Sequence, residues 1–501
     1  MSLFALQGAA LPTVAEPAII GVMLLYGVIV GGIAVWATRL TRTAKDFFVA
    51  GQGIGIWTLA IAAMSATLSG FAFIGGPGLV YTLGIGAMFI ILPASFTNTM
   101  GAWVLAKRMR LLGEVRGLIT VPDAIGARYR SRAAQGLSGI AILVAIIGYM
   151  ATNVLALGLV VDAVFGTGLA WGIWIGLAVV MAYSAAGGIL AGVYTDLFQG
   201  AVMAFASILV FFYALNAGGG LGGISRTILA GDPGFLGPWG KLTPLAALSF
   251  FFVFGLGALG QPHVIHKFYM LRDPLRLKWY PAIMTAALML TLLLYFGVGV
   301  AVKAEVLKGT LAPLVRADDA TPQFLLYYTP VLLAGLVFAG VAAAIMSTVN
   351  SFINIGAAVI THDLPLALGR TLSNELHWGR LSTVVISVVA ALVAQLSGTL
   401  VAFLGIFGWG LFASTLVPAL AIGLNWPGAT RSGAIASIAT GLVTTLGFET
   451  AAYFKVFSFP AGVTISGLSL VLSLLVFFAV SLLTRSEAED IDPDIRLVME
   501  T

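Results

Sequence analysis

The sequence predicts an all-α integral membrane protein, and three observations lead to this prediction. Of the 501 residues, 60% are hydrophobic and only 9% are charged, and the mean hydropathy is +1.04. A soluble domain carries about 25% charged residues, so most of this surface must face lipid. The apolar residues form long runs rather than the alternating pattern of a β-barrel. In a bilayer, such runs satisfy their backbone hydrogen bonds as helices.

Thirteen apolar runs are long enough to cross a bilayer, which takes about 20 helical residues. Because each run is a candidate span, we predict thirteen transmembrane helices. The runs cover residues 17–38, 55–77, 80–106, 134–161, 168–186, 190–216, 242–266, 280–302, 327–360, 382–400, 401–424, 432–453 and 461–484.

The distribution of basic residues predicts the orientation of the chain. If the N-terminus is outside, 19 of the 25 Lys and Arg residues lie in loops on the cytoplasmic side, and Lys267 is one of these 19. Such an excess is the usual signature of cytoplasmic loops. We therefore expect a multi-pass protein of the cell inner (plasma) membrane, with the N-terminus outside and the C-terminus in the cytoplasm.

Two of the predicted helices are interrupted by Gly and Pro. The second run contains SATLSGFAFIGGPG (Ser65–Gly78), and the seventh contains FGLGALGQPH (Phe254–His263). Both residue types weaken a helix, and in lipid a broken helix persists only where it is buried or lines a cavity. Each broken helix is the first of a block of five helices, and the two successive blocks enter the membrane from opposite sides. This pattern predicts a five-plus-five inverted repeat with its site between the broken helices; the alternative is two ordinary kinks.

The same pattern divides the chain into five parts. Residues 55–217 and 218–425 are the two predicted repeats, each beginning at or shortly before a broken helix. The remaining parts are an N-terminal extra helix with a cytoplasmic loop (1–54), two C-terminal helices (426–484) and a polar cytoplasmic tail (485–501).

The ninth run carries a cluster of polar residues, AAAIMSTVNSFIN (Ala342–Asn354). On a helix, Ser347, Asn350, Ser351 and Asn354 follow the spacing i, i+3, i+4, i+7 and form one stripe, which must face protein or water. Hydroxyls on an intact helix, together with free carbonyls on a broken neighbour, suit a small hard cation such as sodium. The alternative is that the hydroxyls bond back to carbonyls one turn earlier and only assist packing.

Five stretches resemble the sodium/solute symporter family, which includes bacterial sodium/proline symporters and sodium/glucose cotransporters. The resemblance covers roughly residues 20–480 in order. It implies a ten-helix core made of runs two to eleven, with broken first and sixth core helices. The stretches are KDFFVAGQGIGIW (Lys45–Trp57), GGILAGVYTDLFQGAVM (Gly187–Met203), GLGALGQPHVIHKF (Gly255–Phe268), AAAIMSTVNS (Ala342–Ser351) and NWPGATRSGA (Asn425–Ala434).

The resemblance implies a sodium site between the ninth run and the break in the second run. Its ligands would be the hydroxyls of Ser347 and Thr348 and the carbonyls of Ala344, Ser65 and Leu68.

Asp196 allows two interpretations. In some family members the matching aspartate helps to hold a second sodium ion, and an intramembrane carboxylate is by default a functional candidate. Alternatively, Asp196 caps the start of the sixth run.

The solute is expected between the broken helices and the fourth run. Tyr149 matches a tyrosine that is important in sodium/proline symporters, although each aromatic could instead only pack. The chain departs from those symporters at Thr67, where they carry an aspartate, and at Ala258, where they carry an aromatic. The first departure removes a charge near the predicted ion site, and the second widens or reshapes the solute pocket. The candidate solute ligands are Ser69, Phe71, Tyr149, Phe254 and Gln261.

These expectations combine into a functional prediction. No acid and no Lys or Arg is expected in the solute pocket, and burying an unpaired charge is costly. We therefore expect a sodium-coupled secondary active symporter for a small neutral, zwitterionic or monoanionic solute: an amino acid, a monocarboxylate, a pantothenate-like acid or a sugar. The alternatives are a transporter-like membrane sensor and a proton-coupled carrier.

Other classes of protein fit the sequence less well. With four His and no Cys, the chain shows no metal-ligand cluster and no catalytic constellation, so an enzyme is not expected. We expect the partners to be sodium, the small organic solute and the lipid bilayer, with no nucleic acid and no obligate protein partner.

Overall fold

The computed structural model describes residues 16–41, 43–397, 401–457, 459–460, 462–489 and 491–501, and these are overwhelmingly helical. Within these ranges, eleven helices are long and apolar enough to cross a membrane, and there are also two shorter apolar helices, Ile56–Thr67 and Leu169–Ala182. The all-α membrane architecture is thereby confirmed. The count of thirteen spans, the domain boundaries and the inverted repeat stay predictions, and the last residues of the predicted run 382–400 lie outside the described ranges.

The first half of the chain forms ten α-helices. They are α1 (Pro17–Thr38), α2 (Ala44–Val49), α3 (Ile56–Thr67), α4 (Gly76–Leu83), α5 (Met88–Gly101), α6 (Lys107–Val115), α7 (Val121–Tyr129), α8 (Arg132–Phe165), α9 (Leu169–Gly218) and α10 (Gly220–Gly231).

Eleven more α-helices follow within the described residues. They are α11 (Pro244–Gly257), α12 (Pro262–Phe268), α13 (Tyr280–Lys308), α14 (Ala320–Tyr328), α15 (Val331–Ala358), α16 (Leu364–Ala367), α17 (Glu375–Leu396), α18 (Val401–Leu416), α19 (Arg431–Tyr453), α20 (Ile465–Leu483) and α21 (Pro493–Met499).

Both predicted interruptions are present. Helix α3 ends at Thr67, and Leu68 is extended (φ −85°, ψ 92°) before the chain resumes as a π-helical turn and α4. Helix α11 runs into a 3₁₀ turn, and Gln261 is extended (φ −78°, ψ 104°) before Pro262 begins α12. Proline fits the first turn of a helix because its missing N–H would have no partner there. The Gly and Pro residues therefore mark true breaks in two membrane helices.

The predicted fifth and sixth runs join in α9 across a kink at Gly188. This glycine has φ 58° and ψ −148°, a backbone conformation that residues with a side chain rarely adopt. A Cβ atom there would also lie 2.6 Å from the carbonyl oxygen of Phe47. The direction of the chain between the two halves of α9 thus depends on a residue without a side chain.

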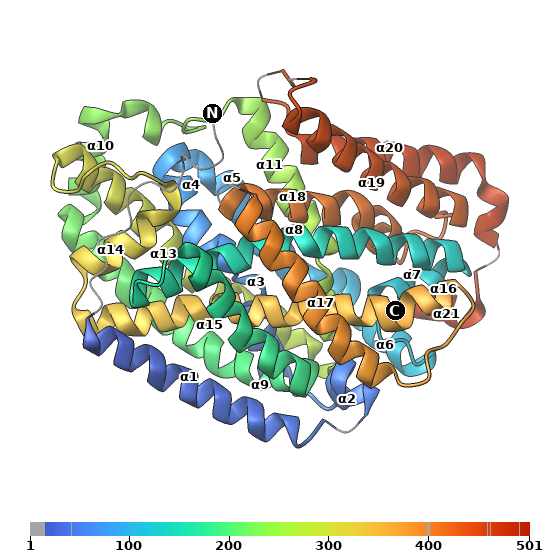
Figure 1. Ribbon diagram of the computed structural model, residues 1–501. Helices are drawn as coiled ribbons and strands as arrows, with labels where there is room; N and C mark the ends of the chain where they lie inside the picture. Colours follow the sequence, from blue (N-terminus) through green and yellow to red (C-terminus); the bar gives the residue numbers. More distant parts are fainter. Residues whose placement is uncertain (1–15, 42, 398–400, 458, 461, 490) are drawn as a thin grey trace.

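Helix α15 lies in the middle of the bundle (Figure 1). It packs against α9, α8 and α1, and every residue from Val337 to Ala358 is buried. Helix α1 lies along the outside of α9 and α15, while α19 and α20 pack together against α18 at another edge of the bundle. The polar stripe predicted on the ninth run is therefore enclosed by protein on all sides.

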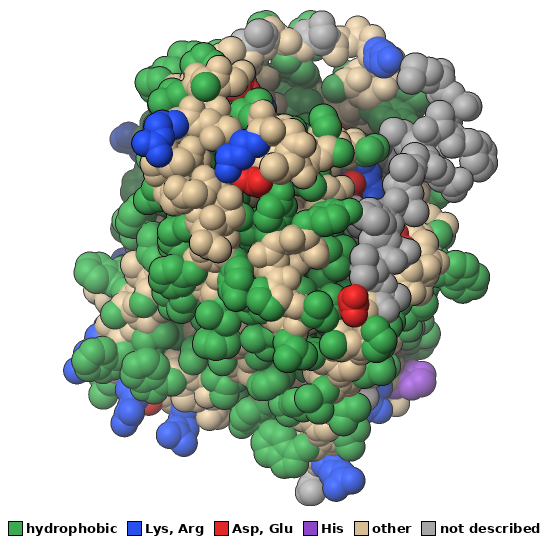
Figure 2. All heavy atoms as spheres, turned by 90° about the vertical axis from the view of Figure 1, so that its left-hand side faces the viewer, with side chains coloured by type: hydrophobic (Ala, Val, Ile, Leu, Met, Phe, Trp, Pro, Cys, Tyr) green, Lys and Arg blue, Asp and Glu red, His purple; other side chains and the backbone are tan. Residues whose placement is uncertain are grey.

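The outer surface is suited to a membrane. Figure 2 shows hydrophobic side chains over the middle of one face, with Lys and Arg gathered toward its upper and lower ends. Large apolar side chains such as Val28 on α1 and Phe212 on α9 are more than half exposed. An apolar band bounded by charges is the pattern expected where lipid covers the middle of the molecule.

The segment before α14 and the first turn of α14 pack on α4, on the π-helical turn before α4 and on the start of α18. A Cβ atom on Gly78 would lie 2.6 Å from the Ala317 carbonyl oxygen, and the Thr321 hydroxyl donates to the Phe73 carbonyl at 2.7 Å. Asp318 accepts a hydrogen bond from the Val401 N–H at 2.9 Å. Burial raises the pKa of Asp318 to about 6, because the charged form loses its hydration.

Gly188→Ala should destabilise the fold. The strained φ and the contact with Phe47 predict a loss of about 1–3 kcal/mol, measured as a lower apparent melting temperature of the purified protein in detergent. Gly447→Ala is the matched control, because a Cβ atom there meets nothing within 4 Å. Equal melting temperatures for Gly188→Ala and the unchanged protein would contradict this account of the kink.

Asp318→Asn should change the pH dependence of stability. Folding raises the pKa of this carboxyl, so its contribution is most favourable when it is protonated and declines as the pH rises through about 6. Asparagine stays neutral and keeps an acceptor for the Val401 N–H. The melting temperature of the variant relative to the unchanged protein should therefore be higher at pH 7.5 than at pH 4.5. A difference that does not depend on pH would contradict the assignment.

Candidate functional site

The break in α3 lies against the middle of α15. The Thr348 hydroxyl donates to the Ala66 carbonyl at 2.9 Å and to the Ala344 carbonyl at 3.1 Å. On the other side of the break, the Gly70 N–H donates to the Asn153 side-chain oxygen at 2.8 Å instead of continuing the helix. Two side chains, from α15 and α8, therefore compensate for the backbone bonds that the interruption removes.

The residues of the polar stripe on α15 are all fully buried but have different surroundings. The Asn350 side-chain oxygen accepts hydrogen bonds from the Ser184 hydroxyl at 2.5 Å and from the Asn354 amide at 3.1 Å. The bond from Ser184 connects α15 to α9. In contrast, the Ser347 and Ser351 hydroxyls have no hydrogen-bond partner among the described residues. Thr348 bonds back to the preceding turn, as the packing alternative requires, but Ser347 does not.

The residues predicted to bind sodium lie around the same break. Thr348 contacts both the α3 carbonyl end and Ala344, Leu68 is the extended residue at the break, and the Ser65 hydroxyl lies 3.6 Å from the Met203 sulfur. The carbonyl that Thr348 contacts is that of Ala66, which the sequence reasoning did not name. Neighbouring carbonyls are chemically identical, so no side-chain signal could have separated them.

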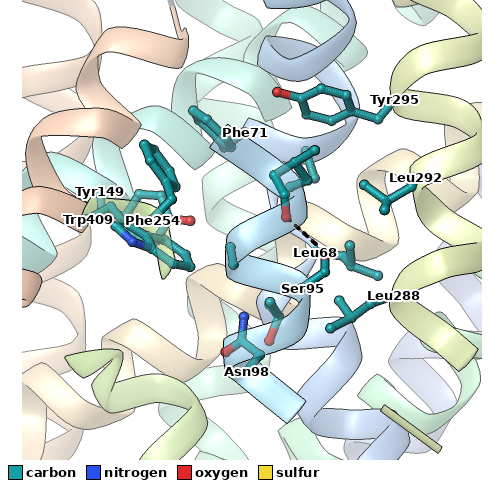
Figure 3. Close-up of a pocket in the computed structure, with 14 residues that line it drawn as sticks. Leu68, Phe71, Ser95, Asn98, Tyr149, Phe254, Leu288, Leu292, Tyr295 and Trp409 are labelled. Atoms are coloured by element: carbon teal, nitrogen blue, oxygen red, sulfur yellow. Dashed lines mark hydrogen bonds between the residues drawn. The ribbon is translucent and has the colours of Figure 1, made fainter. Parts of the chain in front are cut away.

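A cavity adjoins the break in α3 (Figure 3). Figure 3 shows the rings of Tyr149, Phe254 and Trp409 on one side and Leu292 and Tyr295 of α13 on the other. Its volume is only ≈ 30 Å³, room for one or two water molecules, so its walls must move apart to admit an organic solute. The lining residues are Thr67, Leu68, Phe71, Ala72, Ile91, Ala94, Ser95, Asn98, Tyr149, Phe254, Leu288, Leu292, Tyr295 and Trp409.

The predicted solute ligands divide into two groups. Phe71, Tyr149 and Phe254 line the cavity; Ser69 is not part of the lining, but its hydroxyl lies 3.4 Å from that of Tyr149. Gln261 is not part of the lining, and its amide donates to the Gly257 carbonyl at 2.9 Å within the broken helix. Gln261 therefore supports the break in α11 rather than the cavity wall.

Several residues that line the cavity were not predicted from the sequence. Asn98 is buried, and neither its amide nitrogen nor its amide oxygen has a hydrogen-bond partner among the described residues; the same is true of the Tyr295 hydroxyl. Ser95 and Asn98 lie one turn apart in the apolar run 80–106, and this spacing could have identified them. Trp409 had no such signal, because an aromatic in an apolar helix usually only packs.

Aromatic stacking joins the two broken helices to α18. The Phe71 and Phe254 rings are stacked with centroids 5.8 Å apart, and Phe254 stacks on Trp409 at 5.2 Å. Tyr149 contacts Trp409 edge to face at 6.3 Å. A solute entering the cavity must separate these rings, so solute binding and the relative positions of the helices are physically linked.

Asp196 is neither exposed nor at a helix end. The helix around it starts at Gly188, so the N-cap interpretation is wrong. Its carboxylate lies 3.0 Å from the Lys267 ammonium, and the side chains are 0% and 1% exposed. The expectation that Lys267 belongs to a cytoplasmic loop is therefore also wrong, because it lies in the last turn of α12 and is buried against Asp196.

A second polar cluster lies at the end of α15. Ligand-type atoms of Asp123, His362 and Asp363 all lie within 4.8 Å of one another, a spacing that a metal ion could use. They are already bonded, however: His362 to Asp123 at 3.0 Å, and Asp363 to the Thr120 hydroxyl at 2.5 Å. We interpret this cluster as a hydrogen-bonded connection between α7 and the end of α15.

The chain is similar to characterised transporters over most of its length. It is 27% identical over 470 residues to the osmoregulated proline transporter of Bacillus subtilis, covering 91% of this chain and 92% of that one. It is 26% identical over 430 residues to the sodium/pantothenate symporter of Escherichia coli, covering 84% and 88% of the two chains.

A solved structure has the same fold. The structure of a Na⁺-coupled sialic acid symporter in a substrate-bound, outward-open state matches with a TM-score of 0.76 at 18% identity, covering 93% of this chain and 98% of that one. The similar proteins are transporters rather than enzymes, as expected. A model of the sodium:solute symporter family matches residues 47–441, and the protein therefore belongs to the sodium:solute symporter family.

Proposed function

We propose that this protein is a sodium-coupled secondary active symporter that imports a small neutral, zwitterionic or monoanionic organic solute by alternating access. One observation supports this proposal most strongly. The Ala66 carbonyl, released at the break in α3, meets the Thr348 hydroxyl, and the next two residues, Thr67 and Leu68, line the cavity. An ion bound at the break would therefore act directly on the wall of the solute site.

Sodium is the coupling ion of the family to which the chain belongs. We propose that it binds between α15 and the end of α3, where it is held by the hydroxyls of Ser347 and Thr348 and the carbonyls of Ala344, Ser65 and Leu68. Oxygen ligands of this kind suit a hard cation. If sodium and the solute favour the same conformation, each raises the affinity for the other by the same factor.

The cavity indicates the chemistry of the solute. None of its lining residues carries a charge, and the polar groups at its wall include the Asn98 amide and the Tyr149 and Tyr295 hydroxyls. Such a lining suits a small solute with hydrogen-bonding groups and an apolar body, because a strongly charged one would lose its hydration without a partner. The relatives described as proline and pantothenate transporters support an amino acid or a monocarboxylate.

Uptake into proteoliposomes tests the proposal. Purified protein is incorporated into vesicles, and uptake of radioactive L-proline, pantothenate and N-acetylneuraminate is compared in sodium and choline media. Sodium-dependent accumulation of one of these solutes supports symport. Accumulation driven equally well by a pH gradient in choline would indicate a proton-coupled carrier. Solute binding without uptake would indicate a sensor.

Thr348→Ala should weaken sodium activation. The loss of one hydrogen-bonding hydroxyl, worth about 1 kcal/mol, should raise the half-saturating sodium concentration for uptake about fivefold. Thr348→Ser is the matched control, because it keeps the hydroxyl. If the half-saturating concentration is the same in both variants and in the unchanged protein, Thr348 does not bind the ion.

Asn98→Ala should weaken solute binding more than sodium binding. The Asn98 amide has no partner within the described protein, so its removal should raise the solute concentration at half-maximal uptake about tenfold and leave half-saturating sodium nearly unchanged. Gln395→Ala is the control, because this exposed amide of α17 bonds Trp174 away from the cavity. An unchanged solute affinity in Asn98→Ala would exclude the amide as a solute ligand.

A further inference from the structure

The Asp196–Lys267 ion pair lies beside the proposed sodium site but is not part of it. Lys267 Nζ and Asp196 Oδ2 are 3.0 Å apart, and the two side chains are 1% and 0% exposed. They come from α12 and α9, which both pack against α15, the helix that carries Ser347 of the proposed sodium site. A carboxylate this deeply buried needs a positive partner, and Lys267 supplies it.

The surroundings of Asp196 contain other unsatisfied oxygens. Asp196 Oδ1 has no hydrogen-bond partner in the described chain, and neither do the fully buried hydroxyls of Ser347 and Ser351. One carboxylate oxygen together with hydroxyls is the kind of ligand set that binds a hard cation. The Lys267 ammonium, however, already neutralises the carboxylate at 3.0 Å, so Asp196 offers a further sodium ion no uncompensated negative charge.

We propose that the Lys267 ammonium takes the place of a second sodium ion at Asp196, so that the protein binds a single sodium ion per chain. This inference rests on the proposed symport function. The ammonium is covalently attached to α12 and cannot be released to the cytoplasm. Lys267 therefore provides the positive charge at Asp196 in every transport cycle, and no second sodium ion has to move down its gradient.

Direct sodium binding tests the inference without knowledge of the solute. Saturable binding of radioactive sodium is measured on the purified full-length protein in detergent. The unchanged protein should bind one ion per chain. Lys267→Met keeps a long side chain but leaves the Asp196 carboxylate without its positive partner, so this variant should bind two ions. Asp196→Asn combined with Lys267→Met restores local neutrality and should lose the additional ion.

Lys303→Met is the matched control. Lys303 pairs with Asp232 at 3.1 Å, but Asp232 also pairs with Lys241, so this variant should bind one ion as the unchanged protein does. Two ions in the unchanged protein, one in Lys267→Met, or a second ion in Lys303→Met would each overturn the inference. The count in the unchanged protein decides the question even if Lys267→Met does not fold. Absence of any saturable sodium binding in the unchanged protein would instead refute the proposed function.

Discussion

The structure depends on which groups form hydrogen bonds with the backbone carbonyl and N–H groups where α3 is interrupted. Inside a bilayer, a carbonyl or N–H group without a partner costs several kcal/mol. Here the Thr348 hydroxyl bonds the Ala66 carbonyl, and the Asn153 side chain bonds the Gly70 N–H. Because these partners come from α15 and α8, the interruption is stable only when both helices are packed against it. A cation that binds to carbonyls at the break would act on the same contacts.

The arrangement explains how a gradient could act on a solute. One sodium ion moving through 100 mV releases about 2.3 kcal/mol, and a tenfold gradient adds about 1.4 kcal/mol. Together these would concentrate a neutral solute about 500-fold. Such coupling requires a physical connection between the two sites, and Thr67 and Leu68 provide it, because they follow Ala66 directly and line the cavity. The stacking of Phe71 on Phe254 extends this connection to the second broken helix.

The candidate site was predictable where a side chain carries the signal. Ser347 belongs to a polar stripe in an apolar run, Thr348 next to it was implied by the family resemblance, and the predicted aromatics Tyr149, Phe71 and Phe254 lie in the cavity wall. Asn98 and Asn153 were missed, although polar residues in apolar runs are visible in the sequence. The pairing of Asp196 with Lys267 could not be inferred, because 71 residues separate them and a lysine near a helix end normally lies in a loop.

The sequence by itself determined the membrane class and the two helix breaks. These properties are local: apolar runs must span lipid as helices, and Gly with Pro weakens a helix wherever it lies. Only the tertiary structure decided which carbonyl meets Thr348, which charge neutralises Asp196 and how small the cavity is. These features depend on the distances between helices that are far apart in the chain, and such distances are set by side-chain packing across the whole bundle.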